Sequence, residues 1–267
     1  MKTSHEIDYD IFGEEMQAVR LELDSDETVL AEAGSLMMMD GNIEMNTIFG
    51  DGSGRSQSIM DKLFSAGKRV LTGERLFMTT YTHRGVGKAH VTFAAPYPGK
   101  VIPIDLSQLD HKIICQKDAF LAAAKGVSIG IEFQRRLGVG FFGGEGFIMQ
   151  KLEGDGMAFV HAGGTVIEKT LLPGESLKVD TGCLVAFTSH IDYDIEMVKG
   201  IKTAIFGGEG LFLARLTGPG KVWIQSIPFS RLAERVFAAA PSQGEKRKGE
   251  GSILGGLGDL LDGDNRF

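Results

Sequence analysis

The sequence predicts an all-β protein: antiparallel sheets of the β-sandwich or double-stranded β-helix type, in three repeated units with pseudo-threefold symmetry. Three observations lead to this prediction. The chain has 37 glycines but only 7 prolines in 267 residues, and glycine supplies the positive-φ backbone that tight turns need. Short stretches rich in Val, Ile, Phe and Thr are separated by Gly pairs, as strands joined by turns are. One segment of fifteen residues also occurs twice in nearly the same form.

The duplicated segment reads FGGEGFIMQKLEGDG from Phe142 and FGGEGLFLARLTGPG from Phe206, an offset of 64 residues (206 − 142). The stretches DAFLAAAKGVSIGIE and GCLVAFTSHIDYDIE end at Glu132 and Glu196, and their apolar positions coincide at the same offset of 64. The register therefore holds without a gap over about forty residues. Such self-similarity indicates a tandem duplication rather than two similar turns.

A weaker third copy precedes these two. GSLMMM matches the start of GCLVAF, and TGERLFM matches GGEGFIM and GGEGLFL. Between these landmarks the first copy carries an insertion. We expect a short helix near 58–66 in it, capped by Ser58 and placing Ile59, Leu63 and Phe64 on one face.

We expect residues 1–240 to form a single β-domain, because a unit of roughly 64 residues with exposed sheet edges does not hold a stable core alone. The three units should therefore pack against one another. The predicted parts are units at about 5–105, 106–170 and 171–229, a closing helix at 230–240, and a flexible tail rich in Gly and charge at 241–267.

The closing helix is predicted from SRLAERVFAAA, which places Leu232, Val236 and Phe237 on one face before Pro241. The tail that follows carries a brief amphipathic stripe interrupted by glycines. It is either a frayed end or a weak docking peptide for a neighbour or a membrane surface.

Charge and cysteine content narrow the class of protein. A formal net charge of −7 disfavours nonspecific binding to phosphate backbones, so nucleic acid is an unlikely partner by charge alone. Cys115 and Cys183 lie in apolar strand-like stretches, and we expect both to be buried free thiols. The N-terminus lacks the features of a signal peptide, and no apolar run approaches the length of a membrane span. We therefore expect a cytoplasmic location.

Several of these segments resemble a known family. GTVIEKTLLPGESLKVDTGCLVAF, FGGEGLFLARLTGPGKVWIQSIP and LTGERLFM are similar to the signatures of the family named after the fungal altered inheritance of mitochondria protein. The resemblance covers about residues 5–240. It implies a β-sandwich fold related to the trp RNA-binding attenuation protein and to double-stranded β-helices, and it implies no catalytic residues. The mitochondrial members associate with the inner membrane; this chain lacks a transit peptide, so that location is not carried over.

Motifs for chemistry give little support to an enzyme. GVGFFG at 138–143 matches the glycine pattern of dinucleotide sites, but a strand-like EGFIMQKL follows where a helix N-terminus is needed. A cupin-type metal site needs two His two residues apart, with a following Glu and a distant third His. The six histidines (His5, His83, His90, His111, His161 and His190) contain no such pair. We predict a protein without catalytic residues, cofactor or metal.

Four residues are candidates for ligand contact. His161 lies mid-strand beside a glycine pair, where backbone can approach a ligand closely; it is otherwise a hydrogen-bonded structural residue. Glu74, Glu145 and Glu209 follow Gly in the repeated turn. They are either equivalent ligands around the axis or carboxylates that accept backbone N–H bonds in the turn. The structural reading is favoured for all four, and it is likewise favoured for Met37–Met39 as core and edge residues rather than a binding surface.

Two loops are candidates for interaction with a partner. Each places cations before apolar side chains, as in RRLGVGFFGG and KGIKTAIFGG, and such loops suit another subunit or an anionic bilayer surface. In the alternative, the aromatic residues cover the core of their own unit. The candidates are Arg135, Arg136, Phe141, Phe142, Lys199, Lys202, Ile205 and Phe206.

The resulting functional hypothesis is a non-enzymatic β-protein that forms a homo-oligomer, trimer or larger, and serves as an interaction or scaffold module, with a membrane surface as one site of action. A small-ligand or RNA-binding module is the alternative by analogy with the fold. A metal-dependent enzyme ranks third.

Overall fold

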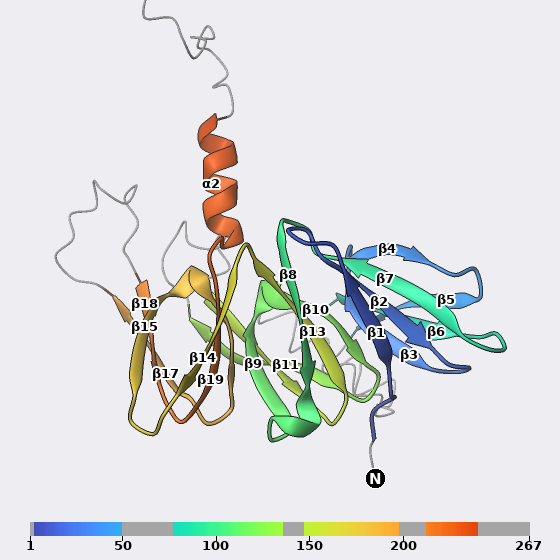
Figure 1. Ribbon diagram of the computed structural model, residues 1–267, viewed down its shortest axis with the longest axis horizontal. Coiled ribbons are helices and arrows are strands. Elements are labelled where there is room, and N and C mark those ends of the chain that lie inside the picture. The colour runs from blue at the N-terminus through green and yellow to red at the C-terminus, as the bar shows by residue number, and fades with distance from the viewer. Residues whose placement is uncertain (1–2, 50–76, 136–146, 198–211, 240–267) are drawn as a thin grey trace, which may run out of the picture. The chain divides into compact units, whose positions relative to one another are not determined.

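The computed structural model describes residues 3–49, 77–135, 147–197 and 212–239. It confirms the all-β class: within the described residues the chain forms antiparallel strands, short 3-10 turns and one C-terminal helix (Figure 1). The helix predicted near 58–66 lies outside the described residues.

The strands follow one another in three successive segments. The first holds β1 (Asp8–Phe12), β2 (Ala18–Leu23), β3 (Thr28–Glu32), β4 (Leu36–Met39), β5 (Ile43–Phe49), β6 (Phe77–His83) and β7 (Ala89–Ala94). The second holds β8 (Gly99–Asp105), β9 (Lys112–Gln116), β10 (Phe120–Ala124), β11 (Ser128–Arg135), β12 (Phe147–Glu153) and β13 (Met157–Gly163). The third holds β14 (Val166–Leu171), β15 (Ser176–Asp180), β16 (Leu184–Thr188), β17 (Asp192–Met197), β18 (Phe212–Thr217) and β19 (Gly220–Gln225).

These strands pair into four sheets within the described residues. Sheet A has the order β1-β2-β7-β4, and sheet B the order β5-β6-β3-β10-β13-β8. Sheet C has the order β11-β12-β9-β16-β19-β14, and sheet D the order β15-β18-β17. Sheets B and C each combine three strands of one segment with three of the next, so the segments are joined by hydrogen bonds across β3–β10 and β9–β16.

The same pairing order occurs in all three segments of the described chain. In the first, β2 and β4 flank β7 while β3 and β5 flank β6. In the second, β8 and β10 flank β13 while β9 and β11 flank β12. In the third, β14 and β16 flank β19 while β15 and β17 flank β18. We call β2–β7, β8–β13 and β14–β19 units one, two and three. Descent from a duplication and a threefold axis both stay predictions.

A β-bulge marks equivalent residues in the three units. It falls between Leu36 and Met38 in β4, between Phe120 and Ala122 in β10, and between Leu184 and Ala186 in β16. A bulge inserts one residue into a strand and bends it. Met38, Ala122 and Ala186 therefore occupy one equivalent position.

The strand pairing falls across both predicted boundaries between units. β8 lies in the predicted first unit, 5–105, yet it pairs with β13 along its whole length; β14 lies mainly in the predicted second unit, 106–170, yet it pairs with β19. The sequence pattern marks strands and turns but does not show with which neighbour a strand pairs, because pairing is a long-range contact.

Three apolar cores lie between the sheets. The unit-one core joins side chains of sheet A, such as Leu21, to side chains of sheet B, such as Phe159. The unit-two core lies between sheets B and C, and the unit-three core between sheets C and D. In β10, Ala122 faces the unit-one core while Ala123 faces the unit-two core. The central strands of sheets B and C, such as β10 and β16, thus bury both faces, in agreement with their apolar sequences.

The predicted C-terminal helix is confirmed as α2 (Phe229–Ala239). None of its residues is buried. Its expected apolar face remains open, with Val236 61% and Phe237 79% exposed. A helical period predicts which residues share a face but not whether another element covers that face.

The cysteines are both free thiols, as predicted, but only Cys115 is buried; Cys183 is partly exposed. Burial raises the pKa of the Cys115 thiol to about 12, and the nearby Glu32 carboxylate adds to this shift. Cys115 is therefore unreactive at neutral pH.

Truncation of Phe159 tests the role of the unit-one core. Phe159 is fully buried and meets the ring of Tyr9 edge-on, with ring centroids 5.1 Å apart. We expect Phe159→Ala to lower the free energy of unfolding by about 3–5 kcal/mol, measured by urea denaturation. The control is Phe12→Ala on the exposed strand β1, which should cost less than about 1 kcal/mol. Equal losses for the two variants would contradict this assignment.

Candidate functional site

Most of the predicted contact residues lie outside the described residues. The backbone of Arg135 ends β11, opposite Phe147 of β12. The residues outside the description are Glu74, Arg136, Phe141, Phe142, Glu145, Lys199, Lys202, Ile205, Phe206 and Glu209. The two candidate loops and the repeated Gly-Glu turn therefore stay predictions.

His161 is the one described candidate for ligand contact, and it is buried. It lies in β13 opposite Val101 of β8, with only 1% of its surface exposed. The Tyr97 ring meets its imidazole edge-on, with centroids 4.4 Å apart. A Cβ added to Gly99 would lie 2.5 Å from Nε2 of His161, so only glycine fits at position 99. A ligand could reach the imidazole only if the surrounding chain moved.

The imidazole of His161 is held in its neutral form. Burial lowers its pKa to about 4, and the Tyr97 backbone opposes this shift. Neither ring nitrogen of His161 makes a well-aligned hydrogen bond within the described part of the chain. Such a group is costly in a folded protein. The buried His161 side chain therefore lowers the free energy of unfolding, whereas a hydrogen-bonded side chain at this position would raise it.

Gln225 of unit three shows what a paired side chain does at this position. It lies 64 residues after His161, in β19 where His161 is in β13. Its Oε1 accepts a hydrogen bond from the Gly163 N–H at 2.7 Å, and its Nε2 donates to the Gly182 carbonyl at 2.8 Å. The side chain thereby ties β13 to the 3-10 turn η4 (Thr181–Cys183). The equivalent position is structural in unit three.

Glu32, at the end of β3, was not singled out from the sequence. Burial raises the pKa of its carboxyl to about 7; the Asp118 carboxylate adds to this shift and Lys117 opposes it. Burial also raises the pKa of Tyr97 to about 12, with Asp118 and Glu32 adding to it. The sequence signal that could have identified Glu32 is a carboxylate directly after the apolar run TVLA, whose residues are buried in β3. Within the described residues, no group of three or more His, Cys, Asp or Glu is placed to hold a metal ion.

The exposed apolar surface of β4 is the second feature that the sequence did not predict. Met37, Met38 and Met39 are 56%, 53% and 38% exposed. They were expected to be core and edge residues. Their expected position on an edge strand is confirmed, since β4 ends sheet A. Their expected place in the core is wrong, because all three side chains are exposed. An exposed apolar edge strand is a typical site of association.

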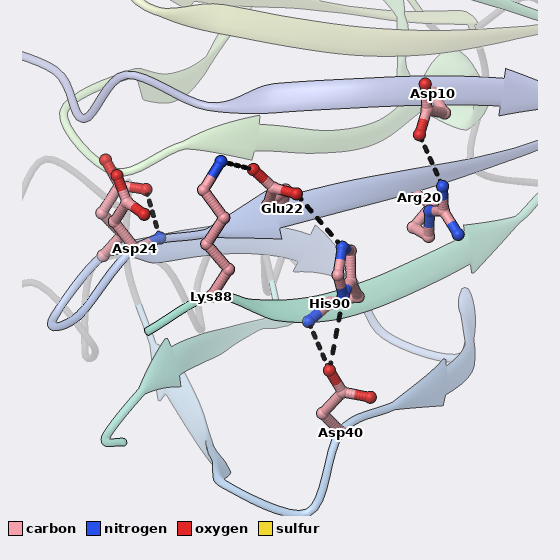
Figure 2. A network of polar contacts seen from close by, with 8 residues as sticks. Asp10, Arg20, Glu22, Asp24, Asp40, Lys88 and His90 are labelled. Carbon is pink, nitrogen blue, oxygen red and sulfur yellow. Dashed lines mark hydrogen bonds and ion pairs between the residues drawn. The ribbon is translucent and has the colours of Figure 1, made fainter. Parts of the chain in front are cut away.

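A polar network fixes the end of β4 (Figure 2). His90 of β7 contacts two carboxylates: its Nε2 lies 3.3 Å from Glu22 of β2 and its Nδ1 lies 3.5 Å from Asp40, the residue after β4. The backbone N–H of His90 also donates to the Asp40 carboxylate at 2.8 Å. Lys88 binds the other oxygen of Glu22 and lowers the pKa of that carboxyl. Exposed pairs of this kind add little stability, but they hold Asp40, and with it β4, against β7.

Comparison with known proteins places the chain in a family. A model of the family described as Mitochondrial biogenesis AIM24 matches residues 9–227, which include all the strands of the three units. The chain belongs to this family. The family assignment agrees with the resemblance seen in the sequence signatures.

Two relatives of this AIM24 family chain come from Streptococcus pyogenes. An uncharacterised protein of serotype M6 is 30% identical over 219 residues, which are 80% of this chain and 83% of that protein. A crystal structure of an S. pyogenes protein matches with a TM-score of 0.67 and 22% identity, over 88% of this chain and 100% of that chain. The second likeness shows a shared fold. Neither relative carries a stated activity.

The described part of this AIM24 family chain contains no helix long and apolar enough to span a bilayer.

The unpaired imidazole predicts a specific pH dependence. The pKa of His161 is lowered from 6.5 to about 4, so the fold holds a neutral imidazole that the unfolded chain protonates below pH 6.5. The free energy of unfolding therefore falls as the pH drops from 6.5 to 4, by on the order of 3 kcal/mol, whereas this group causes no pH dependence above pH 6.5. Glu32 acts in the opposite sense, because its raised pKa favours the fold at low pH and this contribution is lost as the pH rises through about 7. We therefore expect the difference in free energy of unfolding, His161→Gln minus wild type, to be more positive at pH 4.5 than at pH 7.5. Urea denaturation at the two pH values measures this difference.

The control for this experiment is His190→Gln, since the His190 side chain is 66% exposed. It should change the free energy of unfolding by less than about 1 kcal/mol at both pH values, because the exposed ion pair of His190 with Asp110 contributes little. An unchanged difference between His161→Gln and wild type across this pH range would contradict the neutral, buried state of His161.

Proposed function

We propose that this AIM24 family protein is non-enzymatic and forms a homo-oligomer that serves as an interaction or scaffold module. Self-association is the central part of the proposal. The observation that carries it is the contrast between β4 and its equivalents: all five residues of β10 and of β16 are buried, whereas no residue of β4 is.

β10 and β16 are buried because each has a strand on both sides and an apolar core on each face. β10 pairs with β3 of unit one, and β16 pairs with β9 of unit two. Pairing satisfies the backbone N–H and C=O groups on the open side of a strand and covers its side chains. β4 is equally apolar but pairs only with β7 among the described strands. A soluble protein covers an apolar edge of this kind most simply by association.

The described titratable groups support a structural role rather than catalysis. His161 and Cys115 are buried and held in their neutral forms. Gln225, at the position equivalent to His161, ties β13 to the 3-10 turn η4. These groups are enclosed by the fold and do not converge on a common surface, whereas catalytic groups must reach their substrate.

Light scattering coupled to size exclusion tests the proposal. We expect a mass of at least three times the 28.8 kDa of the chain at micromolar concentration. Because an exposed apolar edge is the basis of the proposal, moderate salt should not dissociate the assembly. A mass of one chain at all concentrations would contradict self-association. In that case the scaffold role would also lose its support.

The proposal includes a cytoplasmic location and action at an anionic membrane surface, both on sequence grounds. The loops with Arg135, Arg136, Lys199 and Lys202 combine cations with apolar side chains. We expect the protein to sediment with phosphatidylglycerol vesicles and not with phosphatidylcholine vesicles. Replacing the four cations with alanine should reduce sedimentation at least about tenfold, since each basic residue near an anionic surface contributes about 1 kcal/mol. Equal sedimentation of variant and wild type would contradict this part of the proposal.

A further inference from the structure

β4 and β15 are open-edged strands whose equivalents in the other units are paired on both sides. β4 ends sheet A and pairs with β7 alone, and β15 ends sheet D and pairs with β18 alone, among the described strands. They come from the first and the last of the three units. Every other equivalent of these two strands, in the part of the chain that the structure describes, is paired on both sides.

The two junctions inside the chain share one register. Ala31 and Leu30 of β3 lie opposite Ala122 and Ala123 of β10. In the next junction, Cys115 and Ile114 of β9 lie opposite Ala186 and Phe187 of β16. The offset of 64 residues relates β9 of unit two to β15 of unit three. A third junction in the same register therefore has β15 as its first strand, with Val179 and Lys178 equivalent to Cys115 and Ile114.

The partner of β15 in such a junction is the equivalent of β10 and β16, which is β4. The recurring bulge aligns Met38 with Ala122 and Ala186. The third junction therefore places Val179 opposite Met38, and Lys178 opposite Met39. Because each strand alternates its faces, the register also fixes which side chains share a face.

The third junction completes a sheet that is already half present at each end of the chain. Sheet D supplies β17-β18-β15, and sheet A supplies β4-β7-β2. Joined at β15 and β4, they give the order β17-β18-β15-β4-β7-β2. This order is equivalent, strand by strand, to sheets B and C.

Side-chain burial agrees with the same junction. Leu121 and Ala122 of unit two lie in the unit-one core, and Val185 and Ala186 of unit three lie in the unit-two core. Each unit thus receives two side chains from the following unit at this position. Met37 and Met38 are the equivalent pair in unit one, and they are more than half exposed. Met37 and Met38 of a second copy are therefore the equivalent pair to enter the unit-three core, since no described strand follows unit three in its own chain.

We expect the β15–β4 junction to form between two copies, because β4 in sheet A and β15 in sheet D of one chain are too far apart to pair. The cores show that sheet A packs on sheet B, sheet B on sheet C, and sheet C on sheet D, with opposite faces of B and C in use. Stacked sheets lie about 10 Å apart, so three spacings separate sheet A from sheet D by roughly 30 Å. Paired strands lie about 5 Å apart. A single chain cannot close this gap without losing a core.

We propose that β15 of one copy pairs antiparallel with β4 of a second copy, with Val179 opposite Met38 and Lys178 opposite Met39. This inference rests on the proposed homo-oligomer and names its interface. The contact is heterologous, since it joins two different edges. Repetition of a heterologous contact gives a closed ring or a filament.

Single-cysteine chains test the pairing. All chains carry Cys183→Ser to remove the partly exposed native thiol, while Cys115 is buried. One chain carries Met38→Cys and the other carries Val179→Cys. Opposed residues in antiparallel strands have Cα atoms about 4.5–5.5 Å apart, which suits a disulfide. Under mild oxidation, we expect the mixture to give cross-linked dimers, and each chain alone to give at least tenfold less.

Matched controls separate a specific pair from random collision. Met45 in β5 is 51% exposed, close to Met38, so a chain with Met45→Cys should not cross-link to Val179→Cys. A chain that carries both Met38→Cys and Val179→Cys should give a ladder of larger covalent species. Cross-linking of Met38→Cys with itself, or no more cross-linking of the mixture than of the Met45 control, would overturn the pairing.

A second pair of variants tests the edge without oxidation. Met38→Glu places a carboxylate in the junction, where its burial is costly, and should weaken association at least about tenfold by light scattering. Met45→Glu should leave association unchanged. Both side chains are half exposed within the chain, so both variants should keep the wild-type unfolding midpoint when measured at concentrations where the protein is monomeric. Equal association of Met38→Glu and Met45→Glu would overturn the proposal.

The outcomes distinguish this inference from the proposed function. A wild-type protein that is monomeric at all concentrations contradicts both. An oligomer without the Met38–Val179 cross-link contradicts only the edge pairing. A double-cysteine chain that cross-links within itself, with no gain in mass, shows closure inside one chain and overturns the pairing between copies.

Discussion

Backbone pairing at strand edges is the constraint on which the rest of this structure depends. Each unit is a small sandwich of two three-stranded sheets. In unit one these are β2-β7-β4 and β5-β6-β3, so β4 and β3 each lie at an edge. Their unpaired N–H and C=O groups cannot be buried without a partner. A neighbouring unit provides this partner for β3, β10, β9 and β16, through β3–β10 and β9–β16, whereas β4 and β15 have no such partner among the described strands. Two internal junctions thereby convert three weak sandwiches into one body with sheets buried on both faces, and the cores follow from that arrangement.

Much of the strand pattern could be predicted from the sequence because turns and alternation are local properties. Gly174, in the stretch LPGES between β14 and β15, has a positive φ of 79° as tight turns need. The offset of 64 residues relates β9, β10 and β12 to β15, β16 and β18. What could not be predicted was the partner of each strand, as β8 shows. The exposure of Met37–Met39 was missed for the same reason: an apolar strand has the same composition whether it is covered, as β10 is, or open, as β4 is.

The site residues were harder to predict than the strands. His161 was identified as unusual, but the sequence does not distinguish a buried imidazole without hydrogen bonds from one beside a ligand. At the equivalent position, the Gln225 amide accepts one backbone hydrogen bond and donates another. A neutral imidazole also offers one donor and one acceptor. The difference arises from the surrounding backbone, including the close approach of Gly99. Glu32 was missed because its raised pKa depends on burial and on Asp118, which is distant in the sequence.

The thioethers of β4 have a consequence for chemistry in the cell. Methionine is readily oxidised to its sulfoxide, which turns a flexible apolar side chain into a polar one. The three methionines of this strand are open in the separate chain, whereas a neighbouring strand would shield them. Reactive oxygen species would then oxidise the methionines of unassembled chains first. Methionine sulfoxides in β4 would make this edge too polar to pair with β15 of a second copy. Enzymatic reduction of the sulfoxides would restore it.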